Sequence, residues 1–433
     1  MSIAQHSIYT FIGKISQVIA VFVVGVILAR AMGPEGNGTY ELFQLIVTLS
    51  VTIGTLGVGH AMVYIIKRKG IDLHETFSSV LTFGTVWGIT LGILVYAFYS
   101  IFPNILSGLP ANALLVGAIL IPFTLLDAYL IQGFLVELKI KLQSVLIIIK
   151  NILLIITMGI LVWILDLDAQ GIIYAVGITY ILSSLVIITL LKKKYHITFL
   201  YRAHILKESL SFGIKNWLGN IFLILNYRLD MFLVNYYLGV DQVGLYSISV
   251  IIASSLFLIP SSIGPILYST WSDKNVDEMD VSTPKKARQI VFIAFVISLI
   301  AVVFGKIIID VLYGPVFESS YSALVILLPG VIMMTINYVL FNNFASRGKP
   351  IMNSITLVVA LVINIVLNIF FIPKWGINGA ALASTISYTF SAIVSIIAFY
   401  KLRIVKTSNN LVFITLSDIV ELKNALRNLL PKR

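Results

Sequence analysis

Long apolar stretches alternate with short polar segments along the whole 433-residue chain. A helix needs about 20 consecutive apolar residues to cross the hydrocarbon core of a bilayer, so each long stretch predicts a transmembrane helix. The predicted spans cover residues 11–31, 40–66, 77–101, 112–134, 143–165, 171–191, 211–238, 245–271, 289–311, 321–344, 351–372 and 377–400. The pattern therefore predicts an all-α polytopic membrane protein with twelve transmembrane helices.

Basic side chains gather in alternate loops, and this predicts the orientation in the membrane. Segments 67–69, 192–194 and 285–288 are rich in Lys and Arg, whereas the opposite loops hold mainly acids such as Glu35 and Asp241. Loops rich in Lys and Arg stay on the cytoplasmic side. We therefore expect a multi-pass protein of the cell membrane, plasma or inner, with both termini in the cytoplasm.

Composition removes several other classes of function. The chain is 59% hydrophobic and 11% charged, too apolar for a soluble core. Its net charge of +11 comes from the loops that set orientation, so we expect no nucleic-acid partner. With no cysteine and five scattered histidines, the sequence shows no metal-ligand spacing. No loop is long enough for a catalytic domain, so we expect no metal, no cofactor and no enzymatic activity.

The chain contains an internal repeat. The shared residues are Gly33, Gly38 and Tyr40 in the first copy and Gly239, Gly244 and Tyr246 in the second, each shifted by 206 positions. Because six helices separate the copies, the repeat predicts two homologous lobes of the same orientation. We place the lobes at residues 1–208 and 209–405, followed by a cytoplasmic tail at 406–433.

The tail mixes Leu and Ile with charged residues at helical spacing. Two interpretations remain open at this point. The segment is either an amphipathic helix on the inner membrane surface or a solvated chain terminus.

The seventh span carries the most polar face. Arg228 and Asp230 lie near its centre, where a charged side chain costs about 2.5–3.5 kcal/mol on insertion scales. Residues two apart on a helix point to different sides, so each is expected to pair with another helix or to line a wet cavity. The same half of the helix holds Asn216, Asn220 and Tyr227. The alternative is an interhelical ion pair that only locks the bundle.

Other spans carry further candidates for a polar cavity. In the second span a stripe at intervals of three or four residues comprises Glu41, Gln44, Thr48, Thr52, Thr55 and Gly59. The remaining candidates are Lys14, Lys150, Asn342, Asn364 and Asn368. Lys14 lies near a span end and can reach the headgroups, and asparagines within bundles often join helices instead of binding ligands. Amides and cations together suit a substrate with many hydroxyls and a phosphate.

Several of these segments occur together in one known family. Residues 29–40, the Arg228-Leu229-Asp230 sequence, residues 238–247 and residues 375–381 resemble the O-antigen and polysaccharide flippases. That family belongs to the multidrug, oligosaccharidyl-lipid and polysaccharide exporter superfamily. The resemblance implies two six-helix lobes in a V-shaped bundle around a central cavity.

The resemblance also implies a function. A flippase of this kind moves a polyprenyl-pyrophosphate-linked oligosaccharide, such as an O-antigen or capsule repeat unit, from the cytoplasmic to the outer leaflet by alternating access. A proton or sodium gradient coupled through Asp230 or Glu41 would drive it, and polysaccharide polymerase or assembly proteins would be partners of a monomeric transport unit. The alternatives are a cation-coupled multidrug exporter of the same superfamily and a membrane polysaccharide polymerase or ligase.

Overall fold

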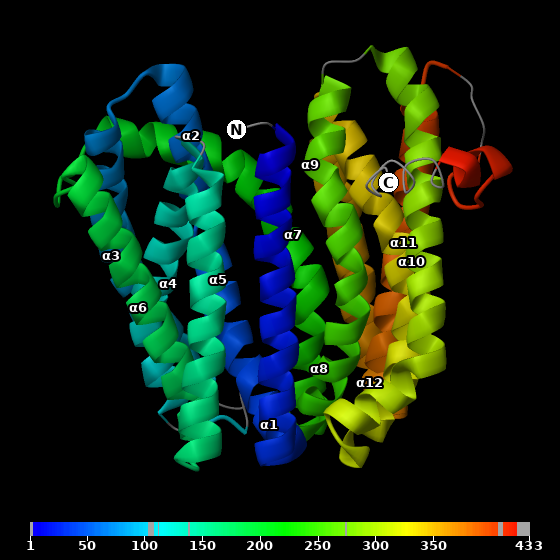
Figure 1. Ribbon diagram of the computed structural model, residues 1–433, viewed down its shortest axis with the longest axis horizontal. Helices are drawn as coiled ribbons and strands as arrows, with labels where there is room; N and C mark the ends of the chain where they lie inside the picture. Colours follow the sequence, from blue (N-terminus) through cyan, green and yellow to red (C-terminus); the bar gives the residue numbers. More distant parts are fainter. Residues whose placement is uncertain are drawn as a thin grey trace, which may run out of the picture. The chain divides into compact units, whose positions relative to one another are not determined.

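A computed structural model describes residues 3–102, 108–110, 112–136, 139–272, 275–405 and 410–421. Every regular element in this part of the chain is helical (Figure 1). The long helices are α1 (Ile3–Gly54), α2 (Val58–Lys69), α3 (Leu73–Ile101), α4 (Ala113–Val136), α5 (Ile140–Met158), α6 (Ala169–Tyr195), α7 (Ala203–Leu238), α8 (Val240–Ser254), α9 (Leu258–Ser272), α10 (Val276–Leu312), α11 (Glu318–Ser346) and α12 (Ile351–Leu402). Short helical segments are η2 (Gly159–Ile164), η3 (Ser255–Phe257) and η4 (Pro315–Phe317).

Ten helical segments within the described residues are long and apolar enough to cross a membrane. Two of them, Tyr9–Gly54 with 46 residues and Ile351–Leu402 with 52, would each extend about 70 Å or more as straight helices. Each is kinked at a glycine with non-helical backbone angles, Gly33 or Gly376. The all-helical membrane fold is confirmed, whereas the number of twelve spans stays a prediction.

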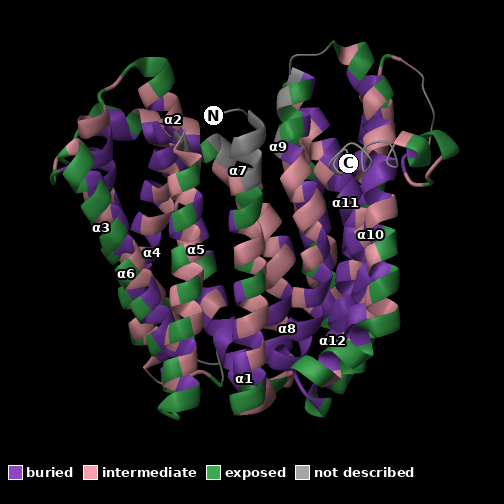
Figure 2. Ribbon diagram, viewed as in Figure 1, coloured by how far each residue is buried: buried purple, intermediate pink, exposed green. Residues whose placement is uncertain are grey.

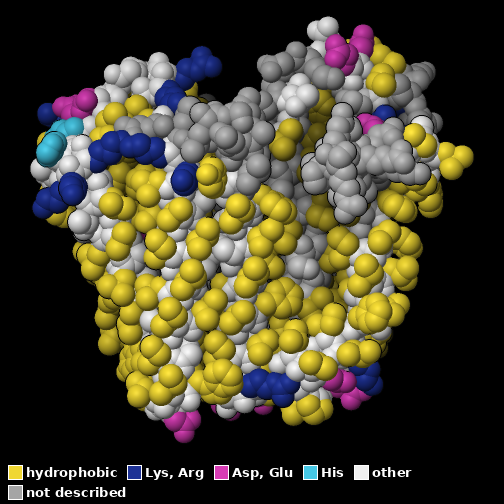
Figure 3. Space-filling view, in the orientation of Figure 1, with side chains coloured by type: hydrophobic (Ala, Val, Ile, Leu, Met, Phe, Trp, Pro, Cys, Tyr) yellow, Lys and Arg dark blue, Asp and Glu magenta, His cyan; other side chains and the backbone are white. Residues whose placement is uncertain are grey.

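The outer surfaces of the helices suit a lipid environment. Hydrophobic side chains cover the middle of α3, α5 and α6, and a group of Lys and Arg side chains lies toward the end where α2 is found (Figure 3). Large apolar residues such as Val86, Ile93 and Ile164 are exposed. In water such a surface would be costly, but hydrocarbon chains cover it without penalty.

The chain divides into two compact units. Unit 1 comprises Met1–Ile248 and Leu312–Phe317, and unit 2 comprises Ser249–Val311 and Glu318–Arg433. The division falls within α8, whereas the repeat places the boundary between lobes at residue 208. Contacts and sequence repeats measure different properties, so the predicted lobes remain a prediction.

Unit 1 has two apolar cores, one between α1, α4, α5 and α6 and the other mainly between α2, α3 and α4. Phe43 and Val176 belong to the first core, and Phe77 and Tyr129 to the second; all four are fully buried. Buried positions alternate with exposed ones along these helices (Figure 2). Packing in these two cores positions the helices of unit 1, and polar side chains lie on other faces of the same helices.

The repeated glycines adopt the same backbone conformation and contact one another's loops. Gly33 has φ 64° and its repeat mate Gly239 has φ 92°, a region that disfavours any side chain. A Cβ added at Gly38 would lie 1.9 Å from the Val240 carbonyl oxygen, and one added at Gly244 would lie 1.9 Å from that of Pro34. Since residues 34 and 38 correspond to 240 and 244 in the repeat, the contact is reciprocal, as in a two-fold symmetric interface.

Unit 2 packs α11 against α9, α10 and α12. Its apolar core includes Trp271, Ile290, Phe344 and Phe399. Buried amides reinforce the contact of α11 with α12, where Asn337 Nδ2 donates to Ser391 Oγ at 2.8 Å. This bond satisfies a polar group that hydrocarbon could not.

Candidate functional site

A polar cavity of about 310 Å³ lies within unit 1 between α1, α4, α5 and α6. Its polar lining includes five amides, Gln17, Gln44, Gln132, Gln143 and Asn151. An amide both donates and accepts hydrogen bonds, so this set can bind a hydroxyl-rich ligand in many orientations. Gln44 lies in the lining of this cavity, and its role in substrate binding stays a prediction.

Lys150 of α5 supplies the cation of this cavity, and it is paired. Its Nζ lies 2.7 Å from Asp127 Oδ2 of α4 and 4.0 Å from the centre of the Tyr180 ring. Ser183 Oγ donates to the other oxygen of Asp127 at 2.6 Å. The ion pair and the aromatic face together hold the ammonium group at the cavity wall, where it can turn toward an anionic ligand.

A second cavity, also of about 310 Å³, adjoins the first, since Ile131 and Gln132 line both. Asn220 and Trp217 of α7 form part of its wall, together with Thr52. Trp217 Nε1 donates to the Thr52 carbonyl at 2.9 Å and so joins α7 to α1. The predicted candidate Asn220 thus faces a cavity.

The backbone breaks at this second cavity. α1 ends at Gly54 and α2 begins at Val58, with left-handed backbone at Leu56 and Gly57 between them. A Cβ at Gly57 would lie 2.2 Å from the Gly213 carbonyl oxygen of α7. The predicted single polar stripe is therefore interrupted before Gly59, because close approach of α7 requires a glycine turn here.

Arg228 of α7 reaches Glu41 of α1. Its Nη1 lies 3.0 Å from Glu41 Oε2 and also contacts Met231 Sδ at 3.7 Å. The Arg228 side chain is 40% exposed, whereas that of Glu41 is 6% exposed. Among the described residues only Nη1 of this guanidinium is hydrogen-bonded, so Nε and Nη2 remain available as a two-pronged donor.

Asp230 lies on a different side of α7 and contacts a different helix. It is 2% exposed, and Tyr246 Oη of α8 donates to its Oδ2 at 2.6 Å. The Met231 backbone N–H donates to Oδ1 at 2.9 Å. The expectation that Arg228 and Asp230 each contact another helix is confirmed. Burial of Asp230 favours a structural contact between α7 and α8, and its coupling role stays a prediction.

The other predicted residues are dispersed. Asn364 and Asn368 are fully buried in unit 2, where Asn364 Nδ2 donates to Ser384 Oγ at 3.2 Å and Asn368 Nδ2 donates to Asn364. Asn342 Nδ2 donates to the Tyr338 carbonyl of its own helix. These bonds are typical of helix packing.

Tyr227 and Lys14 are half-buried in unit 1. The side chain of Asn216 lies outside the described residues. For these residues, as for the three asparagines of unit 2, a role in substrate binding stays a prediction.

Lys150 was predicted as a candidate, but its pairing with Asp127 was not. Lys150 and Asp127 lie 23 positions apart on neighbouring spans, and a Lys and an Asp buried in adjacent helices are a signal for pairing. The contribution of Tyr180 and Ser183 carried no comparable signal, because hydroxyl groups are frequent in transmembrane helices.

Sequence comparison assigns the chain to a family. A profile of the family described as polysaccharide biosynthesis protein matches residues 27–323, which is more than half of the chain. The chain belongs to this polysaccharide biosynthesis protein family. The predicted resemblance to polysaccharide flippases is confirmed at the level of the family.

Individual relatives share about a quarter of the aligned residues with the chain. The chain is 24% identical over 408 residues to a probable low-salt glycan biosynthesis flippase, Agl15, of Haloferax volcanii, covering 91% of this chain and 82% of that protein. It is 24% identical to a putative O-antigen transporter of Shigella flexneri over 38% of this chain and 40% of that protein. An uncharacterized membrane protein of Methanocaldococcus jannaschii is 25% identical over 50% of this chain, which spans only 45% of that relative.

Solved structures share the fold. The inward closed conformation of the lipid II flippase MurJ matches with a TM-score of 0.74 at 18% identity, covering 99% of this chain and 94% of that one. An inward-facing multidrug transporter of the MOP superfamily matches with a TM-score of 0.70 at 16% identity, over 89% and 94%. At these identities the likeness establishes the fold of the family and leaves the substrate to be argued from the site.

Proposed function

We propose that the protein is a membrane flippase that moves a polyprenyl-pyrophosphate-linked oligosaccharide from the cytoplasmic to the outer leaflet by alternating access. Membership of a polysaccharide biosynthesis family supports a substrate built from sugars. Relatives named as a glycan flippase and an O-antigen transporter, and the fold shared with a lipid II flippase, support transport of a lipid-linked form.

The main support for this proposal is that Arg228 has donors available for a pyrophosphate group. A flippase must take a pyrophosphate headgroup out of water, which requires a cation with free donors inside the membrane region. Arg228 bonds Glu41 through one nitrogen only and keeps Nε and Nη2 for two parallel bonds to a phosphate. Lysine offers no such fork, so an arginine at this position favours phosphate recognition over a simple point charge.

The two adjoining cavities of unit 1 would receive the sugars. Their amides and hydroxyls match the hydrogen-bonding groups of an oligosaccharide, and Lys150 would attract a second charged group. Together the cavities offer about 620 Å³, enough for a few sugar residues at the volumes usual for ligand sites.

Glu41 gives the transport cycle a means of ion coupling. A pyrophosphate bound to Arg228 competes for its positive charge and leaves the buried Glu41 with a weakened partner. A proton or a sodium ion would then neutralise Glu41, because an isolated charge is costly at membrane depth. Transport that ignores both a proton and a sodium gradient would remove this part of the proposal.

The same proposal includes the architecture. If each of the two kinked segments crosses the membrane twice, the ten candidate spans become twelve. Two six-helix lobes in a V-shaped bundle would then surround the substrate, with both termini in the cytoplasm and a monomer as the transport unit. Polysaccharide polymerase and assembly proteins of the cell membrane would accept the product.

The competing multidrug exporter is less compatible with the described site. A lipophilic cation needs an acid that is free to bind it. Among the described residues, Asp127 in the cavity wall and Glu41 beside it are already paired with Lys150 and Arg228. The shared fold with multidrug transporters does not separate the two functions.

Deletion of the gene in its host tests the proposal. We expect unpolymerised lipid-linked oligosaccharide to accumulate on the cytoplasmic leaflet and the wild-type chain to clear it. Arg228→Ala should fail to clear it, and Arg228→Lys should restore only part of the activity. Arg202→Ala is the matched control, because Arg202 forms a 3.1 Å pair with Glu75 on the exposed surface. If Arg228→Ala clears the accumulated lipid-linked oligosaccharide as well as the wild-type chain does, the role assigned to Arg228 is contradicted.

A further inference from the structure

The last described segment of the chain, residues 410–421, exposes apolar side chains and buries a charged one. Residues 416–421 form a short helical turn. Leu416 and Val420 are 83% and 57% exposed on it, and Phe413 just before it is 76% exposed. Asp418 on the opposite side is fully buried. A docked segment normally places its apolar side against the protein, so the outward apolar side requires an explanation.

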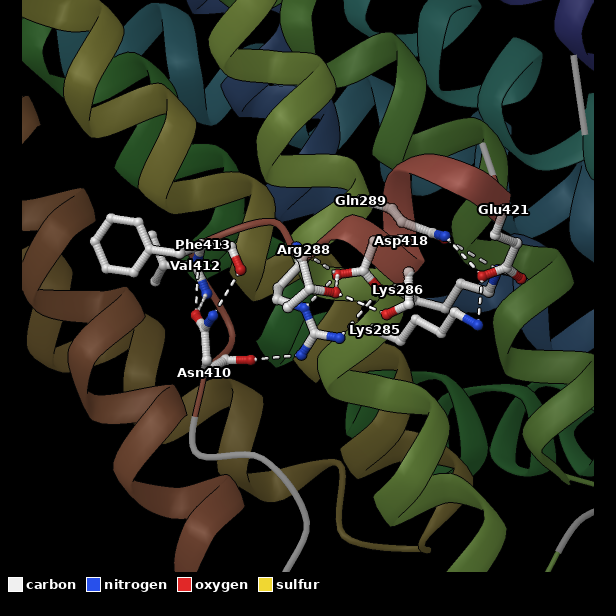
Figure 4. A network of polar contacts seen from close by, with 11 residues as sticks. Lys285, Lys286, Arg288, Gln289, Asn410, Val412, Phe413, Asp418 and Glu421 are labelled. Carbon is white, nitrogen blue, oxygen red and sulfur yellow. Dashed lines mark hydrogen bonds and ion pairs between the residues drawn. The ribbon is translucent and has the colours of Figure 1, made fainter. Parts of the chain in front are cut away.

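The buried polar side is anchored to the start of α10 in unit 2 (Figure 4). Arg288 donates through Nε and Nη2 to the two oxygens of Asp418 at 2.6 and 3.1 Å. Its third nitrogen, Nη1, donates to the Asn410 carbonyl at 2.8 Å. This two-pronged contact fixes the rotation of the turn and directs the apolar side chains away from α10.

Further contacts hold both ends of the segment. Glu421 accepts from Lys285 and Gln289 of α10 at 2.5 and 2.9 Å, and Leu411 is buried in the apolar core of unit 2. Burial raises the pKa of Asp418, but hydrogen bonds from Arg288 and Thr415 outweigh it and lower its pKa to about 2. Both acids of the segment are thus neutralised by α10, and its outer side carries no charge.

The position of the segment indicates what covers the apolar side. The candidate membrane span α12 ends at Leu402, and the segment begins eight residues later. Its first residue can therefore lie no farther than about 27 Å from the end of α12. The sequence beyond it, residues 422–433, has Lys423, Arg427, Lys432 and Arg433 and no acid. An apolar surface beside a span end, followed by four basic residues, matches the boundary of an anionic bilayer.

We propose that residues 410–421 form a membrane-interface element, in which α10 holds the polar side and Phe413, Leu416 and Val420 enter the headgroup and acyl boundary of anionic lipids. The docked segment thereby connects α10 to the bilayer surface. This assignment depends on the membrane location of unit 2 and is independent of the transported substrate.

The absence of cysteine from the chain allows a direct test. A nitroxide is attached to Leu416→Cys in the full-length protein, reconstituted in vesicles that contain phosphatidylglycerol. Ser417→Cys is the matched control, because Ser417 is exposed on the same turn but lies about 100° away from Leu416. The measurement is the accessibility of each label to oxygen, which enters lipid, relative to a water-soluble nickel complex.

We expect the oxygen-to-nickel ratio to be severalfold higher for the Leu416 label than for the Ser417 label, and to fall in vesicles of phosphatidylcholine alone. Addition of Asp418→Asn should reduce the difference between the two labels, since the turn loses its fixed rotation. Equal aqueous accessibility of both labels in anionic vesicles would overturn the proposal and indicate that a protein partner or solvent covers this side.

Discussion

Replacement of Gly244 by alanine tests the reciprocal contact between the two copies of the repeat. The added Cβ would lie 1.9 Å from the Pro34 carbonyl oxygen and 2.7 Å from its carbon. Real Cβ atoms essentially never come closer than 3.0 Å to such neighbours, so the backbone must move by at least the 1.1 Å that separates these distances. Because the neighbouring atoms are backbone atoms, no side-chain rotation relieves the overlap.

Overpacking of this kind costs about 1–3 kcal/mol. For a chain of this length we expect the melting temperature in detergent to fall by a few degrees. Gly38→Ala should have the same effect, since its Cβ would meet Val240 at the same distance. The double variant should cost less than the two single changes together, because one separation of the loops relieves both overlaps.

Gly177→Ala is the control for loss of a glycine. It lies in α6, where an added Cβ finds its nearest neighbour at 3.7 Å, and alanine favours the helix by about 0.5–1 kcal/mol. Thermal unfolding followed by a fluorescent or light-scattering probe compares the variants. The reasoning would be refuted if Gly244→Ala melted at or above the temperature of Gly177→Ala.

Three further predictions concern charged and polar contacts. Lys150→Met should destabilise unit 1, but by less than the cost of removing one partner of a fully buried ion pair, which is about 3–5 kcal/mol. The double variant Lys150→Met with Asp127→Leu should recover most of this loss, as measured in a double-mutant cycle of melting temperatures. Tyr246→Phe should cost about 1–3 kcal/mol because Asp230 loses a buried donor, again measured by thermal unfolding against wild type. The tail should stay docked from pH 8 to about pH 5, since Asp418 is ionised far below its ordinary pKa of 3.8. Its stabilisation is complete above that ordinary value and is lost only as pH falls through about 2, which the mobility of a nitroxide on the tail would report; release near pH 6 would contradict this.

The hydrophobic pattern predicts most of the fold, because a bilayer imposes length and composition on every span. The kinks at Gly33 and Gly376 coincide with the polar segments predicted between spans. The break at residues 55–57 was not predicted, because the local sequence is apolar and its turn depends on the approach of Gly213 from α7. Hydropathy records what lipid requires of a helix but not where a neighbouring helix comes close.

Several residues of the candidate site were predictable from the sequence, but the contacts between them were not. Arg228 and Glu41 both stand out as charges within apolar stretches, yet they are 187 positions apart and only packing brings them together. The three asparagines of unit 2 show the opposite outcome. Asn364 and Asn368 share a face in the sequence, but that face is buried between helices instead of lining a cavity of unit 1. Periodicity identifies a polar face without telling whether it meets water or another helix.

The tail shows the same limit. Helical spacing of apolar and charged residues was visible, but it left open whether the segment is an amphipathic helix on the membrane or a solvated chain terminus. Arg288, whose side chain is nearly buried at the start of α10, reverses this by taking Asp418 into the protein. A buried cation 130 positions away determines which side of the segment is free.

Reconstitution in liposomes can show whether the purified protein moves a lipid-linked oligosaccharide between leaflets. The purified chain is placed in liposomes with a fluorescent polyprenyl-pyrophosphate-linked oligosaccharide, and a membrane-impermeant reagent measures how much of the lipid is exposed outside over time. We predict protein-dependent exchange of the oligosaccharide lipid between leaflets, abolished by Arg228→Ala and retained by Arg202→Ala. A rate of exchange equal to that of protein-free liposomes, together with uptake of a lipophilic cation by the same preparation, would contradict the proposed flippase activity.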